Sequence, residues 1–292
     1  MANFGFVILH YLVSESTVEC VSSIERCCNG AKIVIVDNNS ANGSFEKLQK
    51  TYARDTAVSL LHNPSNEGFA RGNNVGYSYA RDVLHCDYIV TINNDAIVVS
   101  DDFMLRCEND AKANPRVGVI GPDIESGKYG THSNPVYSVI NTKNQINKLL
   151  CKFDFFLLLL HLHLWEPIAK IKKKLIRSNT NSIPEYMNYS PDEKRDEPFK
   201  LHGACLVFTP AFIERFNMPF DPGTFLYFEE DILLMRCEGA NLTMMYDKNI
   251  QVKHAEDVST DQMMENNKHK KLVFTLNNYV YSLRILKRYV KK

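Results

Sequence analysis

Short apolar runs alternate with amphipathic segments over the first hundred residues of the chain. The apolar runs, each ending in polar residues, are 4–11, 31–40, 57–62 and 87–95. The segments between them place apolar residues at helical spacing, in ranges 15–28, 45–53 and 71–84. Strands that are apolar throughout and alternate with helices are typical of a parallel sheet covered on both faces. The sequence therefore predicts an α/β fold, an open sheet of mostly parallel strands flanked by helices.

Polar residues gather at or just after the ends of these predicted strands. In open α/β sheets, ligands bind beyond the carboxyl ends of the strands. The sequence predicts that one edge of the sheet brings together His10, Tyr11, Asp37, Asn38, Asn66, Asn93, Asn94 and Asp95.

The stretch 63–76 (NPSNEGFARGNNVG) is rich in asparagine and glycine and precedes a predicted helix. Its glycines fall four residues apart, which does not match the dinucleotide fingerprint. Free N–H groups at a helix start favour a phosphate, so Asn66, Arg71 and Asn73 are candidates to bind a nucleotide. The alternative, a helix cap and a tight turn, accounts for only part of the cluster.

Composition narrows the class of partner. The 292 residues carry 34 basic and 34 acidic side chains, so no net charge favours a nucleic acid, and none is expected as a partner. The eight cysteines show no zinc-ligand spacing, and we expect them to be reduced packing residues. The N-terminus carries no basic leader, which predicts a cytoplasmic protein.

The middle of the chain contains an apolar stretch, Phe153 to Trp165, about half as long as a bilayer-spanning helix. The lysines that follow it are Lys170, Lys172, Lys173 and Lys174. The stretch fits either a helix in an anionic membrane interface or a buried helix or flap over the core.

The C-terminal segment predicts a basic amphipathic helix. Its apolar stripe is Leu272, Leu276, Tyr279, Leu283, Leu286 and Val290. Its basic residues are Lys270, Lys271, Arg284, Lys287, Arg288, Lys291 and Lys292. Such a helix lies on an anionic membrane surface or docks on its own domain. With the apolar middle stretch, it predicts peripheral binding at the inner face of the cytoplasmic membrane.

Two carboxylates at strand ends are candidates for donor chemistry. Asp37 can accept a hydrogen bond from a pyrimidine N3–H or a ribose hydroxyl, or it can cap the next helix. Asp95 is a candidate ligand of Mg²⁺ or Mn²⁺, because these ions take oxygen ligands from carboxylates and substrate phosphates.

Seven sequence blocks, in this order, resemble the inverting nucleotide-sugar glycosyltransferases of family 2. The blocks are VILHY, IVIVDNNS, NPSNEGFARGNNVG, YIVTINND, LHGACLVFTPAFIERF, FDPGTFLYFEEDILLMRCEGANL and VKHAEDVST. The likeness covers residues 4 to about 260 and is greatest to bacterial enzymes of O-antigen and capsule synthesis, including rhamnosyltransferases. It implies a GT-A fold and transfer of a sugar, such as rhamnose or a hexose, from a UDP- or dTDP-sugar donor to a glycan hydroxyl, the glycan being lipid-linked.

The resemblance also implies site residues. Asp37 would hold the base of the donor, and Asn66, Gly68 and Asn73 would line its nucleotide. Asn93, Asn94 and Asp95 would replace the metal-binding DxD motif, with His254 beside the metal or the diphosphate. Asn93 stands where the family has a first Asp, so one carboxylate is missing. His202, Gly203 and Ala204 are expected on the acceptor or diphosphate side.

The acidic segment 228–231 (FEED) contains the expected catalytic base, which accepts the proton of the acceptor hydroxyl. Spacing from Arg236 selects Glu230, whereas residue type selects Asp231, and both stay candidates. The helix dipole favours acidic residues in a first turn and is compatible with either choice.

These expectations divide the chain into four parts. Residues 1–120 form the donor half, 121–200 an insert that faces acceptor or membrane, 201–262 the catalytic half, and 263–292 the C-terminal helix. The alternative function is a non-catalytic, nucleotide-binding partner at the membrane surface, which the missing motif carboxylate permits.

Overall fold

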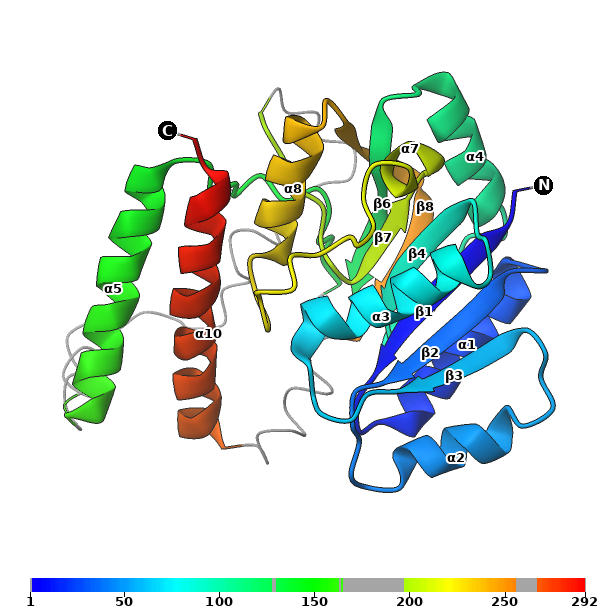
Figure 1. Ribbon diagram of the computed structural model, residues 1–292, viewed down its shortest axis with the longest axis horizontal. Coiled ribbons are helices and arrows are strands. Elements are labelled where there is room, and N and C mark those ends of the chain that lie inside the picture. Colours follow the sequence, from blue (N-terminus) through cyan, green and yellow to red (C-terminus); the bar gives the residue numbers. More distant parts are fainter. Residues whose placement is uncertain (1, 128–129, 163, 165–196, 256–266, 292) are drawn as a thin grey trace.

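A central mixed sheet organises the computed structural model, which describes residues 2–127, 130–162, 164, 197–255 and 267–291 (Figure 1). Within these ranges eight strands form one sheet in the order β3-β2-β1-β4-β7-β6-β8-β5. The N-terminal strands are β1 (Phe4–His10), β2 (Lys32–Asp37), β3 (Val58–His62) and β4 (Tyr88–Asn93). All of their mutual pairings are parallel, as the apolar runs predict.

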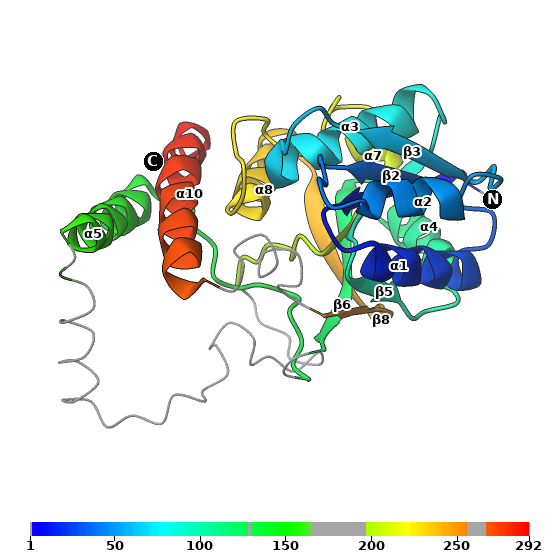
Figure 2. The same ribbon diagram turned by 90° about the horizontal axis from the view of Figure 1, so that it is seen from below.

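Helices cover both faces of this half. Helices α1 (Ser14–Cys27), α2 (Ser44–Thr51) and α4 (Phe103–Ala113) lie on one face, and α3 (Gly68–Asp82) lies on the other (Figure 2). Successive side chains of β1 point to opposite faces of the sheet. Phe6 and Ile8 pack with α1 on one face, and Val7 packs with α3 on the other. The fold class expected from the sequence is confirmed, and α3 begins at Gly68, three residues before the predicted start.

The glycines of helix α3 allow its close contact with the sheet. A Cβ added at Gly72 would lie 2.4 Å from Cδ1 of Leu9, and one at Gly76 would lie 2.3 Å from Cγ1 of Val7. Two glycines four residues apart face the same side of a helix. Their spacing therefore serves helix–sheet packing, whereas the sequence suggested close approach of a ligand.

The second half of the sheet is mixed. Its strands are β5 (Ala96–Val98), β6 (Val117–Ser126), β7 (Cys205–Phe208) and β8 (Thr243–His254). β7 runs antiparallel to both β4 and β6, and β8 pairs in parallel with β6 and antiparallel with β5. Helices α7 (Pro210–Ile213) and α8 (Glu229–Gly239) complete this half. Strand β6 continues to Ser126, so the division expected after residue 120 falls inside a strand.

Two long helices lie side by side at one end of the molecule, α5 (Lys143–His161) and α10 (Lys268–Tyr289), with α10 between α5 and α8 (Figure 1, Figure 2). Leu276, Leu283, Leu286 and Val290 of the predicted stripe are buried, and Leu283 and Leu286 pack with Ile146 of α5 and Ile232 of α8. The stripe of α10 therefore docks on protein.

The outer side of α5 remains apolar and exposed. Phe155, Leu158 and Leu162 are each more than half exposed. Trp165 and the four lysines at 170 and 172–174 lie outside the described residues. Across the parts of the chain that the structure describes, no helix combines the length and apolar character needed to span a bilayer. The cysteines are free, and all but Cys151 are buried, as packing residues should be.

Candidate active site

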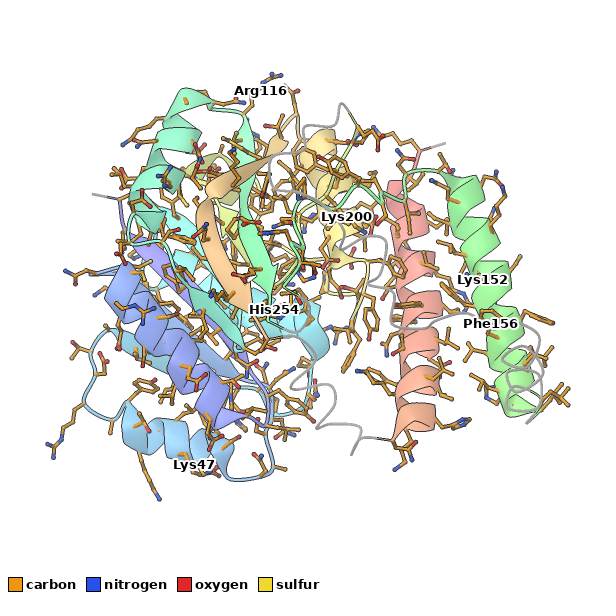
Figure 3. The ribbon with its side chains drawn as sticks, turned by 180° about the vertical axis from the view of Figure 1, so that it is seen from behind. Lys47, Arg116, Lys152, Phe156, Lys200 and His254 are labelled. Atoms are coloured by element: carbon orange, nitrogen blue, oxygen red, sulfur yellow. The ribbon has the colours of Figure 1, made fainter. Side chains whose placement is uncertain are left out.

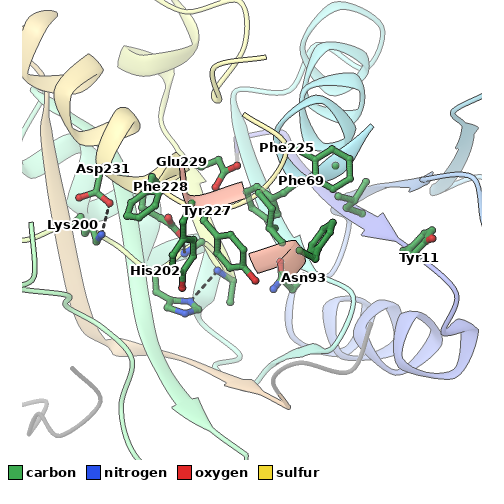
Figure 4. A pocket seen from close by; sticks show the side chains of 18 of the residues that line it. Tyr11, Phe69, Asn93, Lys200, His202, Phe225, Tyr227, Phe228, Glu229 and Asp231 are labelled. Carbon is green, nitrogen blue, oxygen red and sulfur yellow. Dashed lines mark hydrogen bonds and ion pairs between the residues drawn. The ribbon is translucent and has the colours of Figure 1, made fainter. Parts of the chain in front are cut away.

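A cavity of about 630 Å³ opens at the carboxyl edge of β1 and β4 (Figure 4). Its lining includes thirteen residues expected from the sequence: Tyr11, Asn38, Asn66, Gly68, Asn93, Asn94, Asp95, His202, Gly203, Ala204, Glu230, Asp231 and His254. They come from strand ends, loops and the start of α8, which are far apart in the chain. The fold thus brings most of the candidate residues to one place.

Three other candidates have protein partners and do not line this cavity. His10 is fully buried between the hydroxyls of Thr17 and Ser44, at 2.8 and 2.9 Å, and burial lowers its pKa to about 4. The Asn73 amide donates to Phe69 O at 3.0 Å. The exposed Arg71 donates to Pro222 O at 2.7 Å. The buried His10 and Asn73 can contact a nucleotide only after a rearrangement, and the nucleotide role of all three residues stays a prediction.

Asp37 is also outside the cavity lining. Its carboxylate is fully buried, accepts hydrogen bonds from the Ser40 N–H at 3.2 Å, and lies 2.8 Å from Nδ1 of His62. This network occupies both carboxylate oxygens. The contact of Asp37 with a donor base stays a prediction.

Asparagines build the loop before α3. The Asn38 amide donates to Oδ1 of Asn66 at 2.9 Å, and that oxygen also accepts from Gly68 N–H at 3.0 Å. The next amide, of Phe69, donates to Phe225 O at 2.7 Å. Two of the first N–H groups of α3 are thus already satisfied, so fewer are free for a phosphate than the sequence suggests.

Asp95 and His254 form the candidate metal site. His254 ends β8 beside the β4–β5 turn, and its Nε2 lies 3.1 Å from the Asp95 carboxylate. Its Nδ1 is buried and has no hydrogen-bond partner among the residues that the structure describes. Nowhere in the described ranges do three or more His, Cys, Asp or Glu side chains form a possible metal cluster. The Asp95 carboxylate and Nε2 of His254 face each other, and this pair fits a divalent ion that takes its other ligands from substrate phosphates and water.

The two candidate bases differ in their surroundings. Asp231 is fully buried, forms an ion pair with Lys200 and accepts from Ile140 N–H at 3.0 Å. Glu230 is half-buried and, within the part of the chain that the structure describes, accepts a hydrogen bond from Gly203 N–H alone, at 3.2 Å. The carboxylate of Glu230 therefore remains available to a substrate, whereas Asp231 is held in a structural pair (Figure 4).

Two residues immediately before α8 have strained backbone angles, and the acidic residues of the first turn of α8 follow them directly. Tyr227 and Phe228 have φ angles of 75° and 66°, a region that bulky residues rarely adopt. Strain of this kind clusters at functional sites. The neighbouring Glu229 is buried, and this burial raises its pKa to about 8.

His202 presents a neutral ring to the cavity. Its Nδ1 accepts a hydrogen bond from Ala204 N–H at 3.2 Å, which places the ring proton on Nε2. Burial lowers its pKa to about 4, and the nearby His254 ring, 5.8 Å between centroids, acts in the same direction. His202 is therefore a hydrogen-bond donor at neutral pH.

One wall of the cavity consists of residues that were not expected there from the sequence. Lys200 and the aromatic side chains Phe153, Phe225, Tyr227, Phe228, Phe274 and Tyr279 line it. The stretch 225–228 (FLYF), whose last residue begins the FEED segment, is rich in aromatic residues and is the one local signal for this wall. Figure 3 shows Lys200 and His254 inside the molecule, and Lys152 and Phe156 at its outer end, on α5.

Comparisons with known proteins agree with this architecture. The model of the family described as Glycosyl transferase family 2 matches residues 6–163, more than half of the chain. The glycosyltransferase GlyG of Streptococcus pneumoniae serotype 4 is 30% identical over 93 residues, which are 32% of this chain and 30% of GlyG.

Solved structures share the fold at low identity. GalNAc-T7 with UDP, GalNAc and Mn²⁺ superposes with a TM-score of 0.58 at 12% identity, over 87% of this chain and 44% of that one. S. aureus TarS 1–349 with UDP gives 0.53 at 10% identity, over 94% and 65%. The Pyrobaculum calidifontis mannosyltransferase PcManGT with GDP-Man and Mn²⁺ gives 0.52 at 11%, over 99% and 73%. These likenesses confirm the GT-A type fold, and the family match over residues 6–163 shows that this chain belongs to glycosyl transferase family 2.

Proposed function

We propose that this protein is an inverting glycosyltransferase that moves a sugar from a nucleoside-diphosphate donor to a hydroxyl of a glycan. One observation carries the proposal: the half-buried Glu230 carboxylate lines the same cavity as the Asp95–His254 pair. Displacement of a diphosphate by a hydroxyl requires a base for the hydroxyl proton and positive charge at the diphosphate, and a divalent ion held by the Asp95–His254 pair would supply that charge.

The donor is proposed to be a UDP- or dTDP-sugar, with rhamnose or a hexose as the sugar. In support, structures with the same fold contain UDP, UDP-GlcNAc and GDP-Man. Asn38, Asn66 and Gly68 line the cavity at the proposed donor end, and the hydrogen bonds among them hold the loop that shapes the space for the nucleotide. The match to Mn²⁺-containing structures supports a divalent ion held by Asp95 and His254. Mg²⁺ or Mn²⁺ at that position supplies positive charge that stabilises the diphosphate leaving group.

The chain's own residues account for the proton and the positions of the reactants. Glu230 accepts the proton of the acceptor hydroxyl as its oxygen bonds to the anomeric carbon. The bond from that carbon to the diphosphate oxygen breaks, and its electron pair leaves with the nucleotide. Because the attack is opposite the leaving group, the anomeric configuration inverts. The neutral His202 offers its Nε2–H to an oxygen in the cavity.

The acceptor is proposed to be a lipid-linked glycan of bacterial surface polysaccharide synthesis, O-antigen or capsule, with the enzyme peripheral at the cytoplasmic membrane. The aromatic wall and the exposed apolar side of α5 support this proposal, as do exposed cations of α10 such as Lys287 and Arg288. Confinement of enzyme and acceptor to one surface raises their encounter rate.

Thermal unfolding with UDP, dTDP, GDP and CMP, each with and without Mn²⁺, tests the proposal. A ligand at a hundred times its dissociation constant stabilises a protein by about 2.7 kcal/mol. We expect metal-dependent stabilisation by UDP or dTDP, and transfer with inversion of the anomeric centre, followed by NMR. Nucleotide binding without turnover of any donor would favour the non-catalytic partner, and no stabilisation by any nucleotide would contradict both functions.

A further inference from the structure

A second cavity of about 220 Å³ adjoins the first on its catalytic side. It is lined by Ser133, Val136, Ser138, Lys200, Leu201, His202 and Glu230. Lys200, His202 and Glu230 line both cavities. The candidate base therefore lies at their junction, in reach of a group in either one.

The walls of this smaller cavity are fixed by the fold. Val136 and Lys200 exchange two backbone hydrogen bonds of 2.9 Å. The side chain of the fully buried Asn134 donates to Pro122 O at 2.8 Å and accepts from His202 N–H at 2.7 Å. Segments 133–138 and 200–202 are thus locked together, so the cavity is preformed rather than created by a ligand.

An unsatisfied hydroxyl belongs to this cavity. Ser133 is 3% exposed, and its Oγ has no hydrogen-bond partner within the described part of the chain. Buried polar atoms are nearly always hydrogen-bonded, and an exception calls for a missing partner. A ligand hydroxyl would satisfy it. Ser138, which is exposed, and Glu230 add further hydrogen-bonding groups.

Charge and size restrict the ligand. The cation of Lys200 is paired with Asp231, Glu230 contributes a carboxylate, and the His202 ring accepts a hydrogen bond as a neutral imidazole does. No net positive charge therefore favours a phosphate. At about 30 Å³ for each water molecule, the volume holds several waters, which is the scale of one sugar ring and not of a nucleotide.

We propose that the smaller cavity, formed by Ser133, Val136, Ser138 and the shared residues, binds the terminal monosaccharide of a neutral glycan acceptor. One ring hydroxyl lies at Glu230, and a second pairs with Oγ of Ser133. This inference rests on the proposed function and adds to it the acceptor subsite. The proton of the first hydroxyl passes to Glu230 as its oxygen bonds to the anomeric carbon in the larger cavity and the nucleoside diphosphate departs.

Saturation-transfer NMR on the full chain tests the subsite with the methyl glycosides of rhamnose, glucose, galactose and N-acetylglucosamine. Each is measured alone and with Mn²⁺ plus UDP, dTDP, GDP or CMP. We expect at least one glycoside to bind the wild type. Val136→Trp, which fills the cavity, should remove its signal, and Ser133→Val should weaken its binding about tenfold, or about 1.4 kcal/mol. The nucleotide signals should not change in either variant.

Val83→Trp is the matched control, because Val83 is 54% exposed at the end of α3 and outside both cavities. The melting temperature of each variant shows whether it folds, and Ser133→Ala provides a smaller change should Ser133→Val fail to fold. The subsite is wrong if no glycoside binds the wild type, or if binding survives in a folded Val136→Trp. Loss of every nucleotide signal in the wild type would instead contradict the proposed function, while the glycoside result would still be readable.

Discussion

At the scale of single residues, adjacent carboxylates in α8 have opposite environments. Asp231 is fully buried against Lys200, and Glu230 faces both cavities. Side chains at neighbouring positions of a helix point about 100° apart. One turn of α8 can therefore hold Asp231 in a buried ion pair while Glu230 stays accessible from the cavities. This arrangement allows the roles of the two acids to be separated by mutation.

We expect Glu230→Gln to lower kcat about 10²- to 10⁴-fold, because a general base contributes about that factor. Nucleotide-induced stabilisation should stay as in the wild type. Asp231→Asn should instead destabilise the fold by about 3 kcal/mol, since it leaves a Lys200 charge without its partner. Kinetics and urea unfolding separate the two effects. A folded Asp231→Asn that binds nucleotide without turnover, beside an active Glu230→Gln, would assign the base to Asp231.

Glu229 gives the fold a dependence on pH. Burial raises its pKa from 4.5 to about 8 in the folded state, so folded Glu229 binds its proton more tightly than unfolded Glu229. Its contribution to stability is therefore complete below pH 4.5 and is lost as the pH rises to about 8. We expect Glu229→Gln, which resembles the protonated acid, to gain stability relative to the wild type between pH 5 and pH 8. Melting curves across that range measure the difference, and a constant difference would contradict the prediction.

The proposed binding of a metal ion by the Asp95–His254 pair can also be tested at a single side chain. Asp95→Asn removes the carboxylate of the Asp95–His254 pair and should abolish the extra stabilisation that Mn²⁺ adds to a bound nucleotide. Stabilisation by the nucleotide alone should persist. Thermal unfolding with UDP, in EDTA or in Mn²⁺, tests this. An Mn²⁺ increment equal to that of the wild type would place the ion elsewhere.

At the scale of elements, helix α3 depends on how closely it approaches β1. Gly72 and Gly76 face Leu9 and Val7, with room for a hydrogen atom and not for a methyl group. The same helix starts with amides bonded to Asn66 and to Phe225 O, so its position also sets the end of the cavity that Asn66 and Gly68 line. Packing and site geometry are therefore linked through one element.

We expect Gly76→Ala to cost about 1–3 kcal/mol, the usual effect of overpacking, because its Cβ would lie 2.3 Å from Val7 and 2.9 Å from Val36. Gly239→Ala in α8 is the control, since a Cβ there meets nothing within 4 Å. That change should be neutral or slightly stabilising. Urea unfolding measures both variants, and equal effects would show that α3 can move away from the sheet without cost.

Local patterns predicted the N-terminal strands and helices because each of them corresponds to one continuous stretch of sequence with a strand-like or helix-like pattern of apolar residues. They placed His10 and Tyr11 together, although β1 ends at His10, which is fully buried, and only Tyr11, just beyond the strand, lines the cavity. The different surroundings of Glu230 and Asp231 depend on Lys200, which pairs with Asp231 from thirty-one residues away in the chain. The contributions of α5 and α10 to the wall depend on contacts over more than 100 residues, which periodicity does not encode.

At the scale of the whole molecule, the N-terminal half of the sheet and the paired helices α5 and α10 stand at opposite ends, with the cavity between them (Figure 1). The end formed by α5 and α10 has exposed apolar groups on α5 and exposed cations on α10. This polarity is the geometry that a peripheral enzyme with a lipid-linked acceptor would need.

Co-sedimentation with vesicles of phosphatidylcholine, with and without phosphatidylglycerol, tests the membrane proposal. We expect binding that requires the anionic lipid and that falls in Lys287→Glu/Lys291→Glu, since each basic residue near such a surface contributes about 1 kcal/mol. Lys50→Glu/Arg54→Glu makes the same change in net charge at exposed positions in and beside α2, at the other end of the molecule, and is the control. Binding that ignores the anionic lipid, or that both pairs reduce equally, would count against a membrane-facing end.

The position of α10 in the chain has a consequence for biosynthesis. The parallel strands β1 to β4 and their covering helices lie within residues 4–113, and the N-terminal part of a chain leaves the ribosome first. Phe274 and Tyr279 join the cavity only with α10. The parallel strands therefore leave the ribosome well before Phe274 and Tyr279, and the cavity lining is complete only when α10 has emerged and docked.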